Sequence, residues 1–183
     1  NTQTNSTTNY GVNFSYTEPL GGRKYLETNY SIRMNDSDVD RNVYDISNGA
    51  ETFDPLLSNQ YSSQYLYQRA GANIKFNHKD YTLTVGGAYQ FTDLNGQLRL
   101  NDTQINKTFN NFLPAVFFNY SFTSTKRLNF NYETSVQEPT IQQLSPVIDN
   151  SNALNLYVGN PDLGTAYNHR LMLNYSSFNP GTF

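Results

Sequence analysis

Three aspartates at alternate positions are the residues in this sequence best suited to bind a metal ion. Asp36, Asp38 and Asp40 lie beside Asn35 and Ser37, and carboxylate and amide oxygens are the hard ligands that Ca²⁺ prefers. A calcium loop of the EF-hand type would continue with a glycine and a later bidentate glutamate, and neither follows here. The sequence therefore favours a solvated acidic loop, with a calcium site as the lesser alternative, and we expect no bound metal.

The sequence contains no residue pattern typical of an enzyme. His78 and His169 lie far apart and have no nearby carboxylate cluster, so neither a zinc site nor a catalytic base is indicated. The absence of cysteine excludes disulfides and thiolate metal sites. No Gly-x-Ser-x-Gly elbow or phosphate-binding glycine loop is present. We therefore expect no catalytic activity and no cofactor.

The composition limits the classes of protein to which the chain can belong. The net charge of -3 and the pI near 5.2 argue against nucleic-acid binding, which requires a dense basic patch. Only 15% of the residues are charged and 15% are aromatic, and Asn, Ser, Thr and Gln supply the polarity behind a mean hydropathy of -0.66. No apolar run approaches the ~20 residues of a membrane helix, although transmembrane β-strands alternate too regularly to raise the hydropathy average.

Apolar and polar residues alternate along about seven stretches of the chain, which predicts antiparallel β-strands. The clearest stretch sets Leu128, Phe130 and Tyr132 against Arg127 and Asn129. The predicted strands lie near residues 9–17, 26–35, 66–76, 81–91, 112–122, 127–137 and 167–176. Several of these runs are longer than the 5–6 residues usual for strands of soluble proteins.

The predicted connections alternate between short turns and long polar loops. Short turns are expected near 18–23, 77–80 and 123–126, and long loops near 37–64, 93–111 and 139–164. In an up-and-down meander this places all short turns at one end, as in outer-membrane barrels. Tyrosines near the predicted strand ends would form the aromatic girdles of such a barrel: Tyr10, Tyr16, Tyr25, Tyr65, Tyr81 and Tyr175. We therefore predict an all-β, antiparallel up-and-down meander of a transmembrane β-barrel, with a soluble β-sandwich as the less favoured alternative.

The polar face of the predicted strands would line the interior of the barrel. Its charged residues are Glu27, Arg33, Arg69, Lys75, Arg127, Glu133 and Arg170. Charges of both signs can pair across strands, so a hydrated structural lattice is favoured over contacts with a plug domain or a permeating solute. Because about seven strands cannot close a barrel with an even strand number, we expect residues 1–183 to be a single partial β-barrel domain.

Two stretches near the end of the chain carry a more specific pattern. The first is Tyr132-Glu133-Thr134-Ser135-Val136-Gln137-Glu138-Pro139-Thr140-Ile141-Gln142-Gln143-Leu144, and the second is Gly159-Asn160-Pro161-Asp162-Leu163. Together these stretches resemble TonB-dependent receptors of the outer membrane. The insert from Ser145 to Asn152 is similar to the Bacteroidota version of that loop. The chain departs from the family pattern at Gln137, where the family often has Arg, and at Gly164-Thr165-Ala166, where it often has Lys-Pro-Glu.

The resemblance implies a barrel of about 22 strands around an N-terminal plug, with the plug and a TonB-contacting segment outside this sequence. It implies import of a solute across the outer membrane of a Gram-negative bacterium. The expected partners are outer-membrane lipid, the protein's own plug and remaining strands, TonB and, as a further candidate, a surface lipoprotein. Ligand or plug contacts are expected at Glu138, Asp149, Asn150, Asn160 and Asp162. The alternatives are a passive or adhesive outer-membrane barrel without a plug and a soluble β-sandwich binding module.

Overall fold

The computed structural model describes residues 2–47, 49–55, 57–146, 148–149 and 157–178. Among these residues no helix is long and apolar enough to cross a membrane. Nearly every element is a β-strand, and the strands follow one another as antiparallel neighbours.

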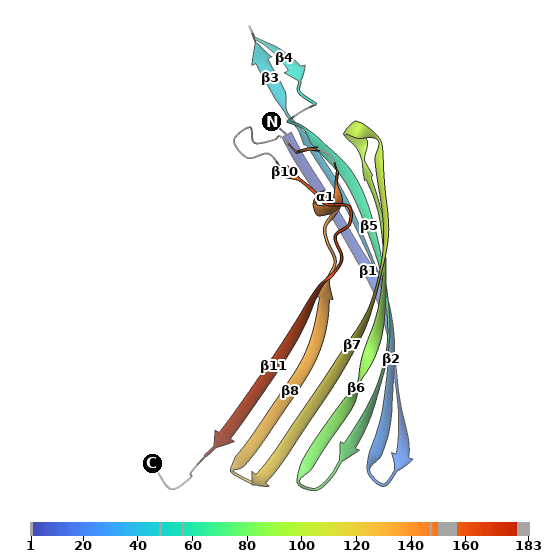
Figure 1. Ribbon diagram of the computed structural model, residues 1–183, viewed down its shortest axis with the longest axis vertical. Helices are drawn as coiled ribbons and strands as arrows, with labels where there is room; N and C mark the ends of the chain where they lie inside the picture. The colour runs from blue at the N-terminus through green and yellow to red at the C-terminus, as the bar shows by residue number, and fades with distance from the viewer. Residues whose placement is uncertain (1, 48, 56, 147, 150–156, 179–183) are drawn as a thin grey trace.

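Seven strands form one antiparallel sheet in the order β1-β2-β5-β6-β7-β8-β11, a meander that confirms the predicted fold class. Figure 1 shows that the sheet is curved and twisted, with all short turns at the end opposite the long loops. The strand bounds are β1 (Thr2–Gly21), β2 (Lys24–Asn42), β5 (Asn59–Asn77), β6 (Tyr81–Leu98), β7 (Thr103–Thr123), β8 (Lys126–Gln137) and β11 (Ala166–Ser177).

The turns at the lower end of Figure 1 are short because each closes a hairpin directly. Gly22 and Arg23 connect β1 to β2 with φ angles of 57° and 59°, the left-handed pair that suits the twist of a two-residue hairpin loop. Ser124 and Thr125 make the corresponding connection between β7 and β8. The prediction of short turns at one end is therefore confirmed.

The loop end contains more regular structure than the sequence predicted. The loop predicted at 37–64 begins inside a strand, because β2 runs to Asn42. The loop predicted at 93–111 is almost entirely strand, because β6 and β7 occupy most of it. Only the 3₁₀ turn η1 (Arg99–Asn101) and Asp102 separate these two strands. A small hairpin of β3 (Tyr44–Ser47) and β4 (Ala50–Phe53) projects from the same end.

The third long connection is a loop as predicted, with short elements of its own. It contains the helix α1 (Ile141–Leu144) and the two-residue strands β9 (Ile148–Asp149) and β10 (Tyr157–Val158), which pair with each other. We call the face of the sheet that α1 covers the inner face, and the opposite one the outer face (Figure 1).

The outer face carries the apolar residues of the alternating pattern without any covering layer. Phe14 is 65% exposed, Leu171 68% and Leu173 67%, as befits side chains that meet lipid tails. No second sheet packs on this face within the described ranges, so the β-sandwich alternative is wrong. The outer edges of the sheet are β1 and β11.

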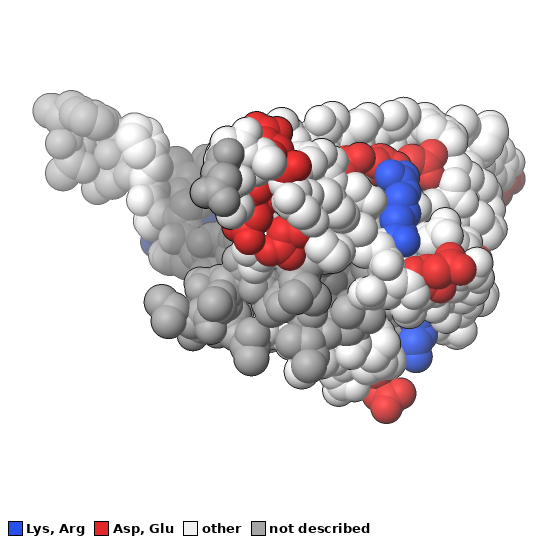
Figure 2. All heavy atoms as spheres, turned by 90° about the horizontal axis from the view of Figure 1, so that it is seen from above, with Lys and Arg blue, Asp and Glu red and all other residues white. Residues whose placement is uncertain are grey.

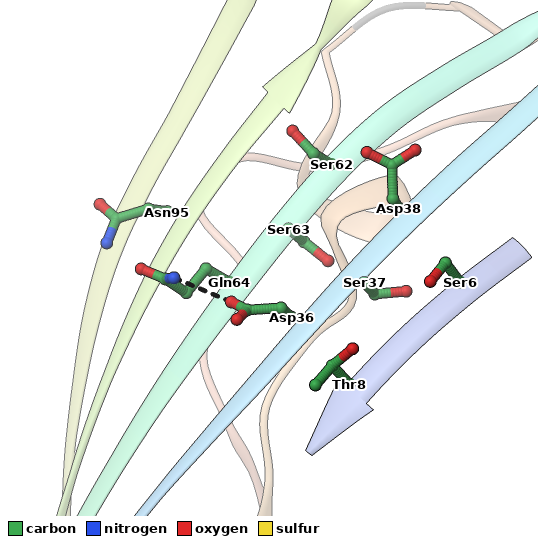
Figure 3. Close-up of a pocket in the computed structure, with 9 residues that line it drawn as sticks. All are labelled: Ser6, Thr8, Asp36, Ser37, Asp38, Ser62, Ser63, Gln64 and Asn95. Carbon is green, nitrogen blue, oxygen red and sulfur yellow. Dashed lines mark hydrogen bonds between the residues drawn. The ribbon is translucent and has the colours of Figure 1, made fainter. Parts of the chain in front are cut away.

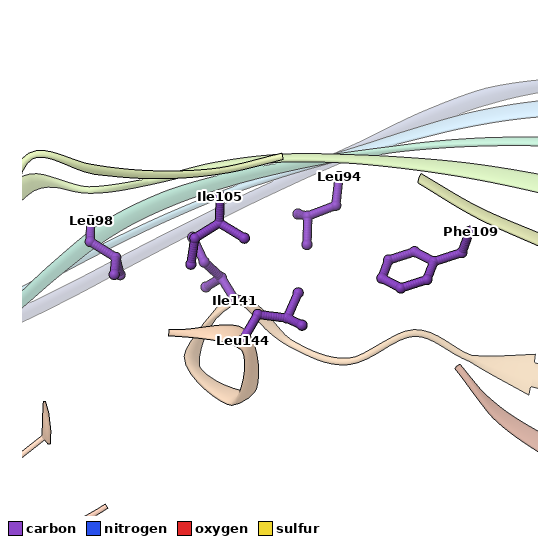
Figure 4. Packing of buried hydrophobic residues seen from close by; sticks show 6 residues of the cluster. All are labelled: Leu94, Leu98, Ile105, Phe109, Ile141 and Leu144. Carbon is purple, nitrogen blue, oxygen red and sulfur yellow. The ribbon is translucent and has the colours of Figure 1, made fainter. Parts of the chain in front are cut away.

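The buried apolar cluster lies on the inner face at the loop end. Figure 4 shows side chains from β6 and β7 directed toward those of α1. The cluster consists of Leu94, Leu98, Ile105, Phe109, Ile141 and Leu144, with Tyr61 and Tyr65 packed against it. Tyr65 therefore belongs to the inner face, and its assignment to a lipid-facing girdle is wrong. The same correction holds for Tyr25, which alternates onto the face of Glu27.

Candidate functional site

The inner face carries mostly basic charges along the strands. Strand alternation and register place the following residues there: Arg33, Arg41, Arg69, Lys75, Lys107, Arg127 and Arg170 as bases, with Glu27 and Glu133 as acids. The outer face of the strands is acidic instead at the loop end, with Asp36, Asp38, Asp40 and Asp93. The two faces of the wall thus differ in charge.

Two of the inner-face charges pair across neighbouring strands. Lys75 Nζ lies 3.4 Å from Glu27 Oε1, and Arg170 Nη1 lies 3.4 Å from Glu133 Oε1. All four side chains are at least a third exposed, so each pair contributes little stability on its own. Pairs of this kind are what the structural interpretation of these charges predicts, and they account for four of the seven predicted residues.

Arg33 and Arg69 form no ion pair with any residue that the structure describes. Arg33 lies opposite Tyr67 and Arg69 lies opposite Ser31, so the two arginines are diagonal neighbours on adjacent strands. Diagonal positions are about 7–8 Å apart. The Arg33 guanidinium carbon lies 4.7 Å from the centre of the Tyr67 ring, which orients it along the wall.

Two cavities open on the inner face around these arginines. One of about 390 Å³ is lined by Arg33, Arg69, Tyr67, Asn13 and Gln90 among others. The second, of about 420 Å³, shares Arg69 and extends past Leu113 and Phe117 to the Glu133–Arg170 pair. Both volumes are in the range of small-molecule sites.

Glu138 is fixed above the first cavity by side chains of β6. Its Oε1 accepts hydrogen bonds from the Thr92 hydroxyl at 2.8 Å and the Gln90 amide at 3.0 Å. The next residue is anchored too, because the Tyr65 hydroxyl donates to the Pro139 carbonyl at 3.0 Å. Thr92 is fully buried. The chain after β8 is therefore drawn onto the inner wall and does not extend outward.

The helix α1 continues this inward segment. Thr140 caps it, since its hydroxyl accepts from Gln143 N while the Gln143 side chain accepts from Thr140 N, a capping box. Ile141 is 2% exposed and Leu144 is 0% exposed, so one turn of helix buries two side chains against the wall. A Cβ at Gly96 would meet the end of the Ile141 side chain, so the glycine leaves room for Ile141 to pack on the wall.

The residues after β10 pack against α1 from the other side. Asn160 N donates to the Gln143 carbonyl at 2.7 Å, and the Asn160 side chain accepts from Asp162 N at 2.9 Å. A Cβ at Gly159 would lie 2.6 Å from the carbonyl oxygens of Gln142, Gln143 and Ser145. The two stretches that carried the family resemblance are thus in contact.

The predicted contact residues of this loop have different positions. Glu138 lies on the inner wall and Asn160 lies beside α1, while Asp162 is exposed in the turn that Asn160 closes. The backbone of Asp149 pairs with Tyr157, and Asn150 lies outside the described residues. The contacts of Glu138 with Gln90 and Thr92 were not predicted from the sequence.

The aspartates considered for calcium belong to β2 and not to a loop, so that part of the prediction is wrong. Asp36 and Asp38 line an outer-face pocket, and Figure 3 shows the Gln64 amide directed at Asp36. Asp36 accepts from Gln64 at 2.8 Å and from the Tyr10 hydroxyl at 3.2 Å, and Asp38 pairs with Arg99. In the part of the chain that the structure describes, no cluster of three or more His, Asp or Glu side chains could hold a metal ion.

Seen from the loop end, Figure 2 shows acidic side chains at several places and basic ones at fewer. The residues near the short turns have the opposite balance, with Arg23, Lys24, Lys79 and Lys126 against Glu18 and Asp80. The charge of the wall therefore differs between its two ends as well as between its two faces.

The comparisons with known proteins agree with this architecture. The family model for the outer membrane protein beta-barrel family matches residues 1–183. No curated protein matches the chain. The match extends over all seven strands of the meander and over the loop that folds onto the inner face. The chain therefore belongs to the outer membrane protein beta-barrel family, and the protein resides in the outer membrane.

Proposed function

We propose that this chain is part of the barrel wall of a TonB-dependent receptor that imports a solute across the outer membrane. The observation that carries the proposal is the contact between the Glu138–Leu144 segment and the Gly159–Leu163 motif. Asn160 N donates to the Gln143 carbonyl at 2.7 Å, and Gly159 fits against three carbonyl oxygens. The residues that resemble such receptors therefore act together as one folded unit on the inner wall.

The proposal includes a larger barrel. The sheet edges at β1 and β11 have backbone groups that face no further strand among the described elements, and an open edge is not stable in lipid. We propose that additional strands of the barrel cover these edges, giving about 22 strands as in receptors of that kind. The proposed partners are a plug, TonB and a surface lipoprotein, and the chain itself has no catalytic role.

A passive barrel without a plug is a second candidate, and the inward segment favours it. Ile141 and Leu144 are buried against the wall by residues of this chain alone. A segment fixed in this way narrows the interior without help from a separate domain. Both candidates are transport barrels, and they differ in whether solute uptake requires energy.

Energy coupling distinguishes the two candidates. Uptake of solutes by cells that carry the full-length protein would be measured with and without TonB, and with and without a protonophore. The receptor proposal predicts that uptake stops when either TonB or the proton gradient is removed. Uptake that persists unchanged in both conditions would replace the receptor with a passive barrel.

A further inference from the structure

The inner-face cavity between Arg33 and Arg69 has the composition of an anion site. Its lining includes two guanidinium groups, the Asn13 and Gln90 amides and the Ser31 hydroxyl. Guanidinium and amide N–H groups are donors, and a guanidinium has no acceptor. No carboxylate is among the described residues that line this cavity.

The two arginines are close without a counter-ion. They are diagonal neighbours on β2 and β5, and neither forms an ion pair within the described ranges. Like charges repel, and diagonal positions lie within reach of long side chains such as arginine. An anion between the two guanidinium groups would remove this repulsion and accept charge-assisted hydrogen bonds from both.

The neighbouring acids are already engaged. Glu138 accepts hydrogen bonds from Thr92 and Gln90, Glu133 pairs with Arg170, and Glu27 pairs with Lys75. The acidic residues of the loop end alternate onto the outer face, as Asp36 and Asp38 do. The positive charge of Arg33 and Arg69 is therefore directed into the barrel interior without an acidic partner among the residues that the structure describes.

We propose that this cavity binds the carboxylate or phosphate group of a small solute. Arg69 is the central ligand, because it lines both cavities, and Arg33 is held in place by stacking on Tyr67. The apolar part of the second cavity, formed by Leu113 and Phe117, takes the uncharged remainder of the solute. The inference deepens the proposed transport function and rests on it only in requiring that solutes enter the barrel interior.

The test is a titration of the purified full-length protein, in detergent, with inorganic phosphate. Binding is monitored by ³¹P NMR. Wild type should bind phosphate saturably. The double substitution Arg33→Gln with Arg69→Gln should weaken binding roughly tenfold or more, since hydrogen bonds to charged groups contribute about 1.5–3 kcal/mol. Arg69→Lys should retain part of the affinity, because it keeps the charge and loses the planar geometry.

Arg127→Gln is the matched control. It removes the same charge from the inner face, but it lies beside the short turn at Ser124 and Thr125, and it should leave phosphate binding unchanged. A far-UV circular dichroism melt of each variant serves to check that its barrel is folded. Displacement of phosphate by acetate assigns the site to carboxylates as well, and no displacement confines it to phosphate groups.

Two results would overturn the anion site: no saturable binding by wild type, or an equal loss of affinity in Arg127→Gln and in the double variant. Failure of the transport proposal gives a different result. If phosphate binding depends on Arg69 but solute uptake does not depend on TonB, the anion site stands and the receptor proposal is wrong.

Discussion

The Thr92 hydroxyl donates a hydrogen bond to the Glu138 carboxylate at 2.8 Å, and this bond joins the inner wall to the segment that folds onto it. Thr92 is 0% exposed, so water cannot replace the lost donor when the hydroxyl is removed. Gln90 adds a second donor from the same strand. The position of the inward segment therefore depends on a few identifiable contacts, and each can be tested by substitution.

Thr92→Val should lower the free energy of unfolding by about 1–3 kcal/mol, because the carboxylate loses a buried donor at nearly constant side-chain volume. The measurement is urea unfolding of the full-length protein in detergent. Thr108→Val is the matched control, since Thr108 donates to Asp93 at 2.9 Å on the exposed surface and should cost well under about 1 kcal/mol. Equal losses for the two variants would show that the Thr92–Glu138 bond has no special role.

Leu144→Ala should release α1 from the wall. The Leu144 side chain is fully buried, and such truncations cost about 2–5 kcal/mol. We expect faster hydrogen exchange at residues 141–145, with the strands unchanged. Leu163→Ala provides the comparison because Leu163 is 38% exposed, and protection of α1 that is equal in the two variants would contradict the packing described above.

Gly159→Ala should separate the Gly159–Leu163 motif from α1. The new methyl group would approach three backbone carbonyl oxygens at 2.6 Å, and backbone atoms cannot move aside as a flexible side chain can. The expected result is a lower melting temperature together with faster proteolysis between β8 and β11. Gly164→Ala should have neither effect, because nothing lies within 4 Å of its Cβ position.

Arg23→Gly should stabilise the first hairpin. Arg23 has a φ of 59°, and this left-handed conformation costs a residue with a Cβ about 1–2 kcal/mol relative to glycine. Part of this gain is lost to the greater flexibility of glycine in the unfolded chain, so a net increase of about 0.5–1 kcal/mol is expected in urea unfolding. Lys24→Gly should have the opposite effect because Lys24 begins β2, and destabilisation by both variants would contradict the turn geometry.

Leu173→Arg should impair insertion into lipid far more than Asn174→Arg does. Leu173 is on the outer face and 67% exposed, whereas Asn174 alternates onto the inner face. A charged residue on the lipid side costs about 2–4 kcal/mol at the bilayer midplane. The comparison is the yield and stability of barrels folded into phospholipid vesicles, and similar behaviour of the two variants would reverse the assignment of faces.

The alternating pattern was sufficient to predict seven antiparallel strands, because one face must be apolar where it meets lipid. It failed between residues 93 and 111, where β6 and β7 continue although their outer face becomes polar. There the pattern inverts: Asp93 and Asn95 are outward in water, while Leu94 and Leu98 are inward under α1. A rule that predicts a loop wherever the outward residues are polar cannot recognise a strand that continues beyond the apolar band.

The candidate site was predictable only in part. The alternation placed Arg33 and Arg69 on the inner face, but it could not show that Lys75 and Arg170 have acidic partners while these two have none in the described part of the chain. That difference depends on the register between β2, β5, β8 and β11. Similarly, Glu138 was expected to contact a ligand or plug, and its hydrogen bonds to the wall follow from the fold of a loop whose direction has no signal in the sequence.

The length of β7 determines what other molecules meet at the cell surface. At about 3.4 Å per residue and a tilt of about 40°, its 21 residues rise roughly 50 Å, about twice the height of the apolar band. The upper part of the wall therefore projects among the lipopolysaccharide sugars as hydrogen-bonded sheet. An antibody or bacteriophage protein that binds there contacts a folded epitope, and a linear peptide copied from residues 93–111 would be a poor immunogen for it.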